Sequence, residues 1–474
     1  MNSLKGYEIK KIGSHRGSPR IWLEGAQPRR AGFTPQVKYD VTVDEEKCLL
    51  RLVISKDGAR VVSKKTSKSN QEIPVIDLNS KEILKVFKGL QSVRVIIEDS
   101  VITILPVASQ IRAMKRMSRM ISRIRGGESL MIGSVASGIG VLDLATHQGL
   151  KEAGIRTKTA FVNEIRSDCM EHAAERNYSY GPETILITSP LQEFVFDSDI
   201  MSRIPEVEVL VAGIPCSGAS VAGRAKNKIV HPEAHPDVGH LVVSWLAVIA
   251  KTNPAVIVLE NVIPYQSSAS MSIIRTQLKD LGYEVHEEIL NAADWGMIEH
   301  RKRLCMVAVT QGMSFSFEGI TPKNVQQMCV GDIMESVPNE SSMWSEMSYL
   351  KAKEITDKAA GKGFKMNIVD ADSTKFNTLT KSLTKRQSTG TFIKHPDKPD
   401  LLRIPTVLEH ARAKGVDESL VVGLGLTFGH EVLGQAIIVP PFVSVFQRIG
   451  QSILSAASVP FEASFEAIPQ RKVG

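Results

Sequence analysis

The sequence predicts an α/β protein whose main domain is built on a parallel sheet covered by helices on both faces. Apolar runs of strand length recur at "SLMIGSVAS", "VEVLVAGIP", "PAVIVLEN" and "LCMVAVT". Helix-like segments separate them, at "VLDLATHQGLKEAG", "HLVVSWLAVIAKT" and "ASMSIIRTQLKDLG". Strands that are apolar throughout and alternate with helices are typical of a sheet buried on both faces. The 474 residues, 43% of them hydrophobic, are enough for more than one domain.

Residues 1–106 are expected to form a separate domain rich in β-strands. "VKYDVTVDEE" alternates apolar and polar residues, and "SVRVIIEDSVITIL" has the pattern of a hairpin with Glu98, Asp99 and Ser100 at its turn. Between them, "KDGARVVSKKTSKSNQEIP" is polar and basic, so we expect a mobile loop there.

Residues 107–127 are expected to form a basic linker helix. In "SQIRAMKRMSRMISRIRGG" the apolar residues fall at helical spacing with arginine and lysine residues around them, and Gly126-Gly127 ends the pattern. A helix packed on the next domain is the favoured interpretation, and a basic helix beside a polyanion site is the alternative.

The α/β pattern holds over residues 128–311, is lost over residues 312–400, and returns over residues 401–474. The middle stretch is polar, and its end, "DADSTKFNTLTKSLTKRQSTGTFIKHPDKPD", is rich in Thr, Lys and Ser. Apolar character returns in "RIPTVLEHARAKG" and "GHEVLGQAIIVPPFVSVFQRIGQSIL". We therefore expect a domain of different composition, followed by a C-terminal segment that rejoins the α/β domain.

Composition narrows the classes of protein and partner. The net charge of +7 and the pI near 9.0 fit a polyanionic partner such as nucleic acid, although many proteins of this size reach +7 without one. The five cysteines include no CxxC pair, which argues against a zinc ribbon, a thioredoxin-type site or a disulfide framework. No apolar run is long enough for a transmembrane helix. The basic N-terminus lacks the apolar core of a signal peptide, so we expect a cytoplasmic protein.

Candidate ligand-binding residues lie where the predicted strands end, because ligands of such sheets bind outside the carboxyl ends of the strands. After the first strand, Gly138 and Gly140 lead into a helix, so the backbone can approach a ligand and the helix N-terminus offers N–H groups. Glu164 ends the next strand, where a carboxylate typically holds ribose hydroxyls. The pattern favours a nucleoside-containing cofactor over an ordinary turn. It also fits a dinucleotide-dependent oxidoreductase.

Three further strand ends carry reactive or charged side chains. In "VLVAGIPCSGAS", Cys216 follows an apolar run that stops at a proline, where a thiolate exposed to a cleft is a nucleophile; taken alone, a cysteine there is more often structural. Glu260 ends the apolar strand of "VIVLENV", where an acid is costly without a partner or a function. Arg301 and Arg303 begin another strand, and their i, i+2 spacing sends both side chains to one face. A thiol, a carboxylate and two guanidinium groups in one cleft suit attack on an electron-poor ring.

Taken together and in this order, these motifs resemble the DNA cytosine-5 methyltransferase family, over about residues 129–310 and again 400–455. "RIPTVLEHARAKG" resembles the segment that braces the family's target-recognition domain, and "VLGQAIIVPP" resembles its last motif, which folds back onto the cofactor site. The resemblance implies a Rossmann-like S-adenosylmethionine-dependent methyltransferase sheet, a smaller target-recognition domain at residues 312–400 and an N-terminal β-rich domain. The matching bracing residues are Arg403, Thr406, Glu409 and Arg412.

The sequence departs from the family pattern at several positions. Ala136 and Val141 stand in the glycine-rich loop where the family has a phenylalanine and a second glycine. Ser217 follows the cysteine in place of Gln, and Glu299 precedes the arginine pair in place of Gln. Ser189 stands where the third cofactor motif has an acid. The cysteine, the strand-end glutamate and the arginine pair are unchanged.

The resemblance implies S-adenosyl-L-methionine as the cofactor and no metal. Three histidines, at 231, 235 and 240, lack close ligand spacing and a fourth partner for a metal ion. The residues implied to bind the cofactor belong to the glycine loop, the next two strand ends, the Pro-Cys loop and the last motif. They are Ala136, Gly138, Ile139, Gly140, Glu164, Ile165, Ser189, Pro215, Gln435 and Ala436.

The implied reaction is methyl transfer to carbon 5 of cytosine through a covalent cysteine adduct. Addition of the Cys216 thiolate to carbon 6 makes carbon 5 enamine-like, so that it takes the methyl group, and loss of the carbon 5 proton then expels the thiolate. By the resemblance, Glu260 holds the protonated ring nitrogen 3 and the exocyclic amine, and Arg303 holds the ring carbonyl oxygen. Arg301 supports Glu260 or the loop. The proton acceptor at carbon 5 is not assigned.

The implied substrate is a cytosine flipped out of double-stranded DNA, because the reacting atoms cannot reach carbon 5 inside a stacked duplex. The loop "SGASVAGRAKNKIVHPEAHPD" is a candidate lid, and "TLTKSLTKRQSTGTF" has a composition that suits phosphate and base-edge contacts. For each stretch a solvated basic loop is the alternative. The expected DNA-contacting residues are Ser220, Arg224, Lys226, Lys228, Lys385 and Arg386.

The N-terminal stretches "PRIWLEG", "RRAGFTP" and "YDVTVDEE" faintly resemble the small β domains of the SymE and AbrB-like group. That resemblance implies a module that dimerises or contacts DNA, and a structural appendage is an equal alternative. The oligomeric state is not predicted beyond a dimer through this domain as one option.

Three other functions stay open. An RNA (tRNA) cytosine-5 methyltransferase shares the architecture, although the long recognition region and the N-terminal β domain favour DNA and a bacterial or phage-type modification enzyme. A non-catalytic DNA-binding relative is a second alternative, and the intact set of Cys216, Glu260 and Arg303 argues against it. A dinucleotide-dependent oxidoreductase needs neither the Pro-Cys loop nor the arginine pair. The target sequence and any restriction enzyme partner in a restriction-modification system are not predicted.

Overall fold

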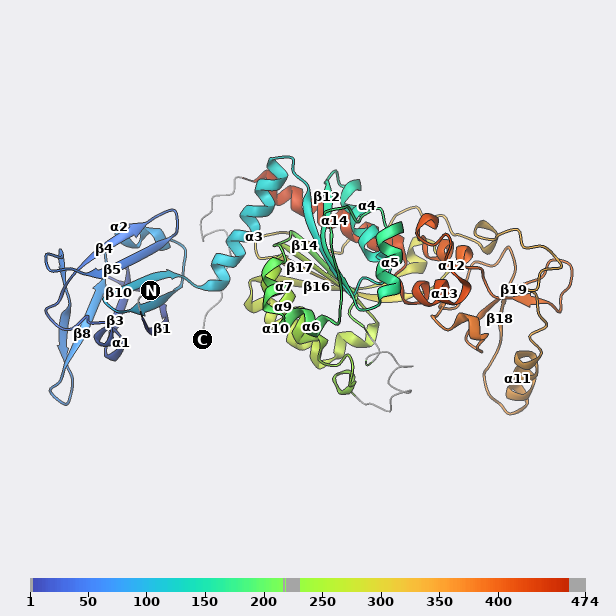
Figure 1. Cartoon of the computed structure of the whole chain (residues 1–474), viewed down its shortest axis with the longest axis horizontal. Helices are drawn as coiled ribbons and strands as arrows, with labels where there is room; N and C mark the ends of the chain where they lie inside the picture. The colour runs from blue at the N-terminus through green and yellow to red at the C-terminus, as the bar shows by residue number, and fades with distance from the viewer. Residues whose placement is uncertain (1–2, 216–217, 219–230, 460–474) are drawn as a thin grey trace. The chain divides into compact units, whose positions relative to one another are not determined.

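The computed structural model describes residues 3–215, 218 and 231–459. They fall into two compact units (Figure 1). The N-terminal unit holds the chain up to Ser118 together with Asp280–Gly282, and the larger unit holds Arg119–Lys279 and Tyr283–Val459.

The N-terminal unit contains two antiparallel sheets around one apolar core. The larger sheet has the order β1-β9-β10-β5-β4-β6 and the smaller has the order β2-β3-β8-β7. Alternating apolar residues, such as Val93, Val95 and Ile97 of β9, turn into the core. The elements are β1 (Leu4–Lys11), β2 (Gly13–His15), β3 (Ser18–Glu24), α1 (Ala26–Arg30), β4 (Lys38–Asp44), β5 (Leu49–Ile54), β6 (Arg60–Val61), β7 (Ser63–Thr66), β8 (Glu72–Leu78), α2 (Lys81–Leu84), η1 (Lys85–Phe87), β9 (Ser92–Glu98) and β10 (Val101–Pro106).

Strand pairing tests two expectations for this unit. β9 and β10 pair as an antiparallel hairpin, so that prediction is confirmed. The expected mobile loop is wrong in part, because β6 and β7 lie within it and β7 pairs with β8 along its whole length. The β7–β8 pairing could not be predicted from apolar alternation, because β7 (Ser63–Thr66) contains no apolar residue.

The helix α3 (Ala108–Arg125) forms within the residues where a basic helix was predicted, so the helix itself is confirmed. In the larger unit, Arg119 Nε lies 2.7 Å from a carboxylate oxygen of the buried Glu208, and Arg123 Nε lies 3.4 Å from its other oxygen. The end of the helix is therefore fastened to the domain that follows, which fits the linker interpretation.

A seven-stranded sheet forms the centre of the larger unit, in the order β13-β12-β11-β14-β15-β17-β16. The strands from β13 to β15 pair in parallel. Strand order reverses between β11 and β14, so the carboxyl ends of these two strands border the topological switch point. The strands are β11 (Leu130–Val135), β12 (Thr157–Glu164), β13 (Ile185–Thr188), β14 (Val209–Ala212), β15 (Val256–Asn261), β16 (Tyr283–Asn291) and β17 (Lys302–Thr310).

The sheet is mixed, whereas the sequence predicts a parallel one. β17 runs antiparallel to both of its neighbours, β15 and β16. A strand buried on both faces is an apolar run in either direction, so its direction does not follow from its composition. β13 and β16 carry exposed or charged side chains instead of an apolar run, and neither follows the pattern that predicts the buried strands.

Helices lie on both sides of this sheet (Figure 1). The helices predicted at α4, α9 and α10 are confirmed. α4 packs closely on α14, since a Cβ on Gly149 would lie 2.4 Å from the Val443 carbonyl oxygen. The helices are α4 (Val141–Glu152), α5 (Ser167–Arg176), α6 (Leu191–Phe196), α7 (Ser198–Arg203), η2 (Pro232–Ala234), α9 (Leu241–Thr252), η3 (Ile263–Ser267), α10 (Ala269–Asp280), η4 (Ala292–Trp295) and α14 (Val439–Ser458).

The polar stretch at residues 312–400 has a small apolar core of its own. Its sheet has the order β18-β19-β20, and Phe376, Phe392 and Leu402 pack in a cluster that also holds Ile298 and Ala413 from flanking segments. This core therefore continues into the approach to β17 and into α12. The elements are η5 (Val330–Asp332), α11 (Ser348–Ala359), β18 (Asn367–Val369), η6 (Leu383–Lys385), β19 (Thr391–Lys394) and β20 (Leu402–Arg403).

The C-terminal segment rejoins the seven-stranded sheet through α12 (Val407–Lys414), η7 (Glu418–Leu420), α13 (Leu426–Gln435) and α14. Thr406 and Glu409 form a capping box at the start of α12, and the buried Arg403 pairs with Glu409 at 2.6 Å. Among the described residues, no single helix is long and apolar enough to cross a membrane, and α13 with α14 passes that test only as a pair bent by 44°.

Candidate active site

Three strand ends meet at the carboxyl edge of the sheet, at the switch point. β11 runs into Ala136, β14 runs into Gly213, and β15 carries Glu260. A Cβ placed on Gly213 would lie 3.4 Å from the Ala136 carbonyl oxygen and 4.0 Å from Glu260 Oε2. The Gly213 N–H also donates to the Val135 carbonyl at 3.2 Å. The glycine loop, the approach to the cysteine loop and the glutamate therefore open onto one edge of the sheet.

The loop between β11 and α4 needs a left-handed backbone. Ala136, Gly138 and Gly140 have φ values of +53°, +58° and +80°. A Cβ on Gly140 would lie 2.1 Å from Asn177 Nδ2 and 2.5 Å from the Tyr180 hydroxyl, so close packing requires glycine there. A Cβ on Gly138 would meet no atom within 4 Å. Gly138 is therefore the position at which a ligand can approach the backbone.

Glu164, at the end of β12, is held beside this loop by two backbone hydrogen bonds. Its Oε2 accepts the Gly138 N–H at 2.8 Å, and its Oε1 accepts the Arg166 N–H at 3.0 Å. The next residue, Ile165, is 60% exposed, whereas Ile139 is buried and its side chain faces the interior. A carboxylate suited to ribose hydroxyls next to an exposed apolar side chain fits the nucleoside part of S-adenosylmethionine.

Ser189 follows β13 and is held next to the end of β12. Asn163 Nδ2 donates to the carbonyls of Ile187 and Ser189, at 3.2 Å and 2.9 Å. Glu164 lies opposite Thr188 in the β12–β13 register. The half-buried Ser189, the next residue after Thr188, is therefore held close to Glu164.

The helix that carries the last predicted motif is tied to the same region. Arg166, two residues after Glu164, pairs with Glu431 of α13 at 2.8 Å. Gln435 ends that helix one turn later with an exposed side chain, and Ala436 follows as its half-buried C-cap. The start of α5 and the end of α13 are therefore linked directly.

Asp143, in the first turn of α4, is buried behind the glycine loop. It accepts hydrogen bonds from Ser134 Oγ at 2.6 Å and from the Tyr180 hydroxyl. Burial raises the pKa of Asp143 to about 6, although both hydroxyl donors oppose the shift. Burial also raises the pKa of Tyr180 well above its ordinary value. This network supports the loop from inside the protein.

Glu260 and Arg303 form an ion pair at the strand ends. Arg303 Nε lies 2.8 Å from Glu260 Oε1, and the two side chains are 17% and 13% exposed. Glu260 lies opposite Cys305 in the β15–β17 register, so Arg303 projects from the same face two residues earlier. The nearer oxygen to Gly213 is Oε2. A carboxylate oriented in this way can accept hydrogen bonds from a ring N–H and an amine.

Arg301 has different partners, although it is only two residues from Arg303. It precedes β17, donates to the Gly434 carbonyl at 3.1 Å, and lies 3.5 Å from Glu299 Oε1. Glu299 Oε2 also lies 2.7 Å from Lys414 Nζ, and both side chains are fully buried. Burial lowers the pKa of Lys414 to about 7. The two arginines predicted to converge on one cleft therefore have separate partners: Arg303 binds Glu260, and Arg301 binds the end of α13.

The predicted nucleophile and most of the candidate lid lie outside the described residues. The structure describes the chain up to the exposed Pro215, and Asn261 Nδ2 donates to the Ile214 carbonyl at 3.3 Å. The approach to the predicted cysteine is thereby fixed to the residue that follows Glu260. In the described part of the chain, no group of three His, Cys, Asp or Glu residues is placed to hold a metal ion. The predicted site residues that are not described are Cys216, Ser220, Arg224, Lys226 and Lys228.

Lys385 and Arg386 are exposed in and after η6, a turn that lies against α13. The end of α13 packs directly on the segment that leads to this turn, since a Cβ on Gly434 would lie 2.1 Å from the Lys381 backbone nitrogen. The same Gly434 accepts a hydrogen bond from Arg301. The candidate recognition turn is therefore connected to the arginine that precedes β17.

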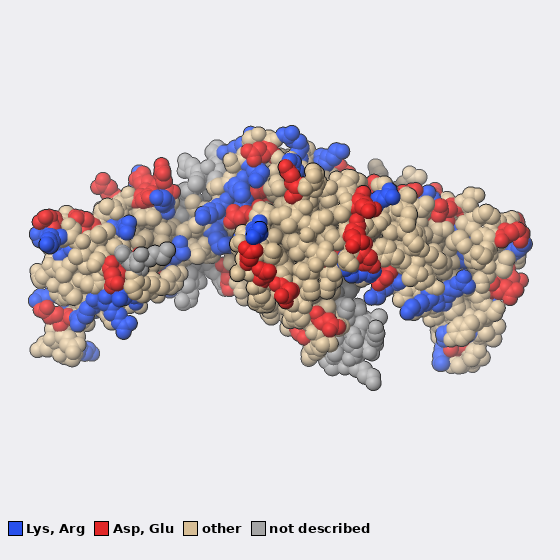
Figure 2. Space-filling view, in the orientation of Figure 1, with Lys and Arg blue, Asp and Glu red and all other residues tan. Residues whose placement is uncertain are grey.

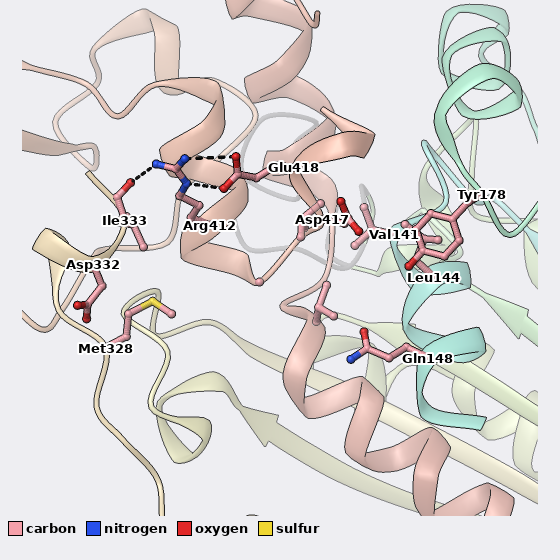
Figure 3. A pocket seen from close by; sticks show the side chains of 13 residues that line it. Val141, Leu144, Gln148, Tyr178, Met328, Asp332, Ile333, Arg412, Asp417 and Glu418 are labelled. Carbon is pink, nitrogen blue, oxygen red and sulfur yellow. Dashed lines mark hydrogen bonds and ion pairs between the residues drawn. The ribbon is translucent and has the colours of Figure 1, made fainter. Parts of the chain in front are cut away.

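A pocket of about 490 Å³ lies beside α4 (Figure 3). Its walls come from α4, the segment after α12 and the start of the recognition region. Arg412 pairs with Glu418 at 2.7 Å in one wall and donates to the Ile333 carbonyl at 3.1 Å. None of the described residues that line it was predicted to bind cofactor or cytosine, so the candidate active site remains at the sheet edge. Its other lining residues include Val141, Leu144, Gln148, Met328 and Tyr178.

Several residues that build the site were not predicted. Asn177 Nδ2 donates to the carbonyls of Ile139 and Gly140, at 3.2 Å and 3.1 Å, and nothing in the sequence around Asn177 marks that role. The role of Lys414 had one indication in the sequence. Glu299 is an acid where the family has Gln, and a buried acid requires a cation as its partner, which is Lys414.

The strand order, the glycine loop at the switch point and the acidic end of the second strand define an α/β protein of the S-adenosylmethionine-dependent methyltransferase class. The model of the C-5 cytosine-specific DNA methylase family matches residues 130–451, and the chain belongs to this family. The predicted family, fold class, enzyme class and S-adenosyl-L-methionine cofactor are thereby confirmed.

Two relatives are Type II methyltransferases. M.NlaX of Neisseria lactamica is 27% identical over 281 residues, which are 58% of this chain and 82% of that protein. M.MspI of Moraxella sp is 27% identical over 271 residues, which are 56% of this chain and 61% of that protein.

Solved structures share the fold. The S. pombe Dnmt2 methyltransferase superposes with a TM-score of 0.53 at 18% identity, over 69% of this chain and 99% of that one. The Entamoeba histolytica methyltransferase EhMeth superposes with a TM-score of 0.50 at 16% identity, over 69% of this chain and 98% of that one.

Proposed function

We propose that this chain transfers a methyl group from S-adenosyl-L-methionine to carbon 5 of a cytosine flipped out of double-stranded DNA. The observation that carries the proposal is the Glu260–Arg303 ion pair, 2.8 Å apart at the strand ends. The residue after Glu260, Asn261, is hydrogen-bonded to Ile214 in the segment that leads to Cys216. Pyrimidine recognition requires a carboxylate and a cation that reach one ring edge, and methyl transfer requires the thiol and the cofactor at the same edge.

In the proposed reaction, the Cys216 thiolate adds to ring carbon 6, carbon 5 takes the methyl group, and loss of the carbon 5 proton expels the thiolate. Glu260 Oε2 accepts from the exocyclic amine and from the protonated ring nitrogen 3. Arg303 fixes the Glu260 carboxylate through Oε1 and donates to the ring carbonyl oxygen. We assign Arg301 a positioning role, because it binds the Gly434 carbonyl and the buried Glu299.

The cofactor supplies an electrophilic methyl group when bound. Gly138 offers open space in front of its backbone, Glu164 offers a carboxylate held in place, and Ile165 offers an exposed apolar surface. Ser189 and Pro215 border the same edge. Of the other assigned residues, Ala136, Ile139 and Gly140 shape the loop, and Gln435 and Ala436 end the helix tied to Arg166.

DNA contact is assigned to two stretches. Lys385 and Arg386 are exposed beside the end of α13, where cations can reach phosphate or base edges. The stretch with Ser220, Arg224, Lys226 and Lys228 is proposed as the lid on sequence grounds. Relatives named Type II methyltransferases favour DNA as the substrate and a role in a restriction-modification system.

The remaining parts of the proposal concern organisation. We assign residues 1–106 to a β-rich domain, 107–127 to a linker helix, 128–311 to the catalytic domain, 312–400 to the target-recognition domain and 401–474 to the returning segment. A dimer through the N-terminal domain is one option for assembly. A cytoplasmic location follows from the proposed substrate, cellular DNA.

Transfer of a labelled methyl group to duplex DNA and to tRNA tests the proposal. Label at carbon 5 of cytosine in the duplex, and loss of that label in a Glu260→Gln variant, is the expected result. The alternative of an RNA methyltransferase predicts label in tRNA alone, and that outcome overturns the proposed substrate. Bisulfite sequencing of a host that expresses the protein then gives the target sequence.

A further inference from the structure

The positive charge of this protein is concentrated in its N-terminal unit. Residues 1–118 contain 22 Lys and Arg against 12 Asp and Glu, a net charge of +10. Residues 119–474 contain the other 36 Lys and Arg against 39 Asp and Glu, a net charge of −3. The unit that carries the catalytic residues therefore contributes none of the net attraction for a polyanion, and the N-terminal unit supplies it.

One hairpin of this unit has no part in the apolar core. The segment from Ser63 to Gln71, "SKKTSKSNQ", contains no apolar residue, and every side chain is exposed except the half-buried Ser67. It is nevertheless ordered by its own hydrogen bonds. β7 pairs with β8, and at the tip the Ser67 N–H donates to the Gln71 carbonyl at 2.9 Å and the Gln71 N–H donates to Ser67 Oγ at 3.0 Å. The hairpin is thus a preformed ribbon of hydroxyl, amide and ammonium groups.

Basic residues of α1 lie against the base of this ribbon. Arg29 donates to the Glu72 backbone carbonyl, and Arg30 next to it is exposed. In Figure 2, lysine and arginine side chains gather over α1 and the adjoining part of β8. We call this set the basic hairpin surface: Arg29, Arg30, Lys64, Lys65 and Lys68.

The surface keeps a positive excess after its ion pairs are counted. Lys64 pairs with Glu72, and Lys65 pairs with Glu24 at 2.7 Å. Both lysines remain about half exposed, at 50% and 47%. Five cations against two carboxylates leave a net charge of +3 on the basic hairpin surface and its partners, which come from the hairpin, α1 and β3. A two-stranded ribbon is a shape that enters a DNA groove and contacts phosphates.

β7 is also the outermost strand of its sheet, and lysines on an edge strand protect against edge-to-edge pairing. That role explains Lys64 and Lys65 on β7 itself. It does not explain Lys68 at the tip, the run of hydrogen-bonding side chains around it, or the arginines of α1, which lie outside the strand.

From these observations we infer that the basic hairpin surface binds the phosphate backbone of duplex DNA, as a second contact outside the catalytic unit. The inference rests on the proposed DNA substrate, and its chemistry is that of phosphate binding without sequence readout. In this inference the N-terminal unit increases the affinity of the chain for DNA, and the larger unit selects the target sequence.

The test compares two triple variants of the full chain in a Cys216→Ala background without cofactor. The hairpin variant carries Arg30→Gln, Lys64→Gln and Lys68→Gln. The matched control carries Lys38→Gln, Lys81→Gln and Lys85→Gln, which are exposed cations of the same unit outside the basic hairpin surface. Both remove three positive charges. Binding of a 40-base-pair duplex is measured by fluorescence anisotropy over a range of salt concentrations, with thermal melting as a check on folding.

The expected result is that the negative slope of log K against log salt becomes shallower by about 2–3 for the hairpin variant, since each lost phosphate contact removes about 0.9 from its magnitude. The control should change the slope by less than about 1. Equal slopes for the hairpin variant and its parent, or equal losses in both variants, overturn the inference. A change in sedimenting mass with no change in slope also overturns it, because the occupant is then a second copy of the chain.

Failure of this inference is separable from failure of the proposed function. Binding is measured without the nucleophile and without the cofactor, so it does not depend on catalysis. If the wild-type chain labels DNA and the hairpin variant keeps the parental slope, only the inference fails. If the hairpin variant loses slope and no DNA is labelled, only the proposed activity fails.

Discussion

Replacing Lys414 with glutamine should destabilise the larger unit, because it leaves a buried carboxylate without its cation. Glu299 and Lys414 are both fully buried, with Oε2 and Nζ 2.7 Å apart. Removing one partner of such a pair typically costs about 3–5 kcal/mol. Glu299 Oε1 keeps the Leu379 N–H at 3.2 Å and Arg301 at 3.5 Å. We therefore expect the lower end of that range, about 3 kcal/mol.

The double variant Glu299→Gln/Lys414→Gln should recover most of this loss. Burial lowers the pKa of Lys414 to about 7, so desolvation outweighs the attraction of Glu299 for the charged lysine. Neutral amides at both positions remove the charge that either single variant leaves without its partner in this pair, and such replacements are often close to neutral. The double-mutant cycle should give an interaction free energy of about 2 kcal/mol or more.

Urea denaturation at pH 6, below the lowered pKa of Lys414, measures these free energies of unfolding. Lys398→Gln is the matched control, since it breaks an exposed ion pair with Glu340, 2.9 Å long, whose side chains are 48% and 85% exposed. That variant should leave the free energy of unfolding almost unchanged, because solvent screens an exposed ion pair. A loss below about 1 kcal/mol for Lys414→Gln, or single losses that simply add in the double variant, would refute the reasoning.

Four more outcomes follow from the glycine loop and its surroundings. Since burial raises the pKa of Asp143 to about 6, the folded chain keeps a proton that the unfolded chain releases between about pH 4 and pH 6. The contribution of Asp143 to stability should therefore fall by roughly 3 kcal/mol over that window, and the difference in free energy of unfolding between wild type and Asp143→Asn, from urea titrations, should change by about that amount. Gly140→Ala should lower the free energy of unfolding by at least about 2 kcal/mol, because its Cβ would lie 2.1 Å from Asn177. Gly138→Ala should stay folded and bind S-adenosylmethionine more weakly in equilibrium dialysis; unchanged affinity would contradict the assignment of open space to the cofactor. Arg166→Gln, which breaks the pair with Glu431, should weaken the same binding by a factor of about 2–5, and no change would show that α13 does not support the cofactor site.

Much of the fold could be predicted because burial on both faces leaves a clear mark in the sequence. β14 and β15 are almost entirely apolar, and the helices between them have apolar faces, so their existence and order follow from composition. The direction of β17 could not be predicted, since it depends on which neighbour its side chains pack against. β7 was missed because backbone hydrogen bonds hold it and no apolar side chain marks it.

The candidate site divides in the same way. Gly138, Glu164 and Glu260 lie at or just after the ends of apolar strands, and an unusual residue in that position can be recognised from the sequence alone. Asn177 and Glu431 act through partners far along the chain, and only the packed structure shows which atoms they reach. Their types, an amide and a surface acid, are common enough that their positions in the sequence give no signal.

Covalent trapping on a duplex that carries 5-fluorocytosine tests the central claim most directly, because fluorine at carbon 5 prevents the proton loss that releases the thiolate. Wild-type protein should form a denaturation-resistant complex in the presence of S-adenosylmethionine, and Cys216→Ala should form none. Cys169→Ala is the matched control and should trap as well as wild type, since this thiol is buried and its pKa is raised to about 12. No complex with wild type, or an equal complex with Cys216→Ala, would contradict the account.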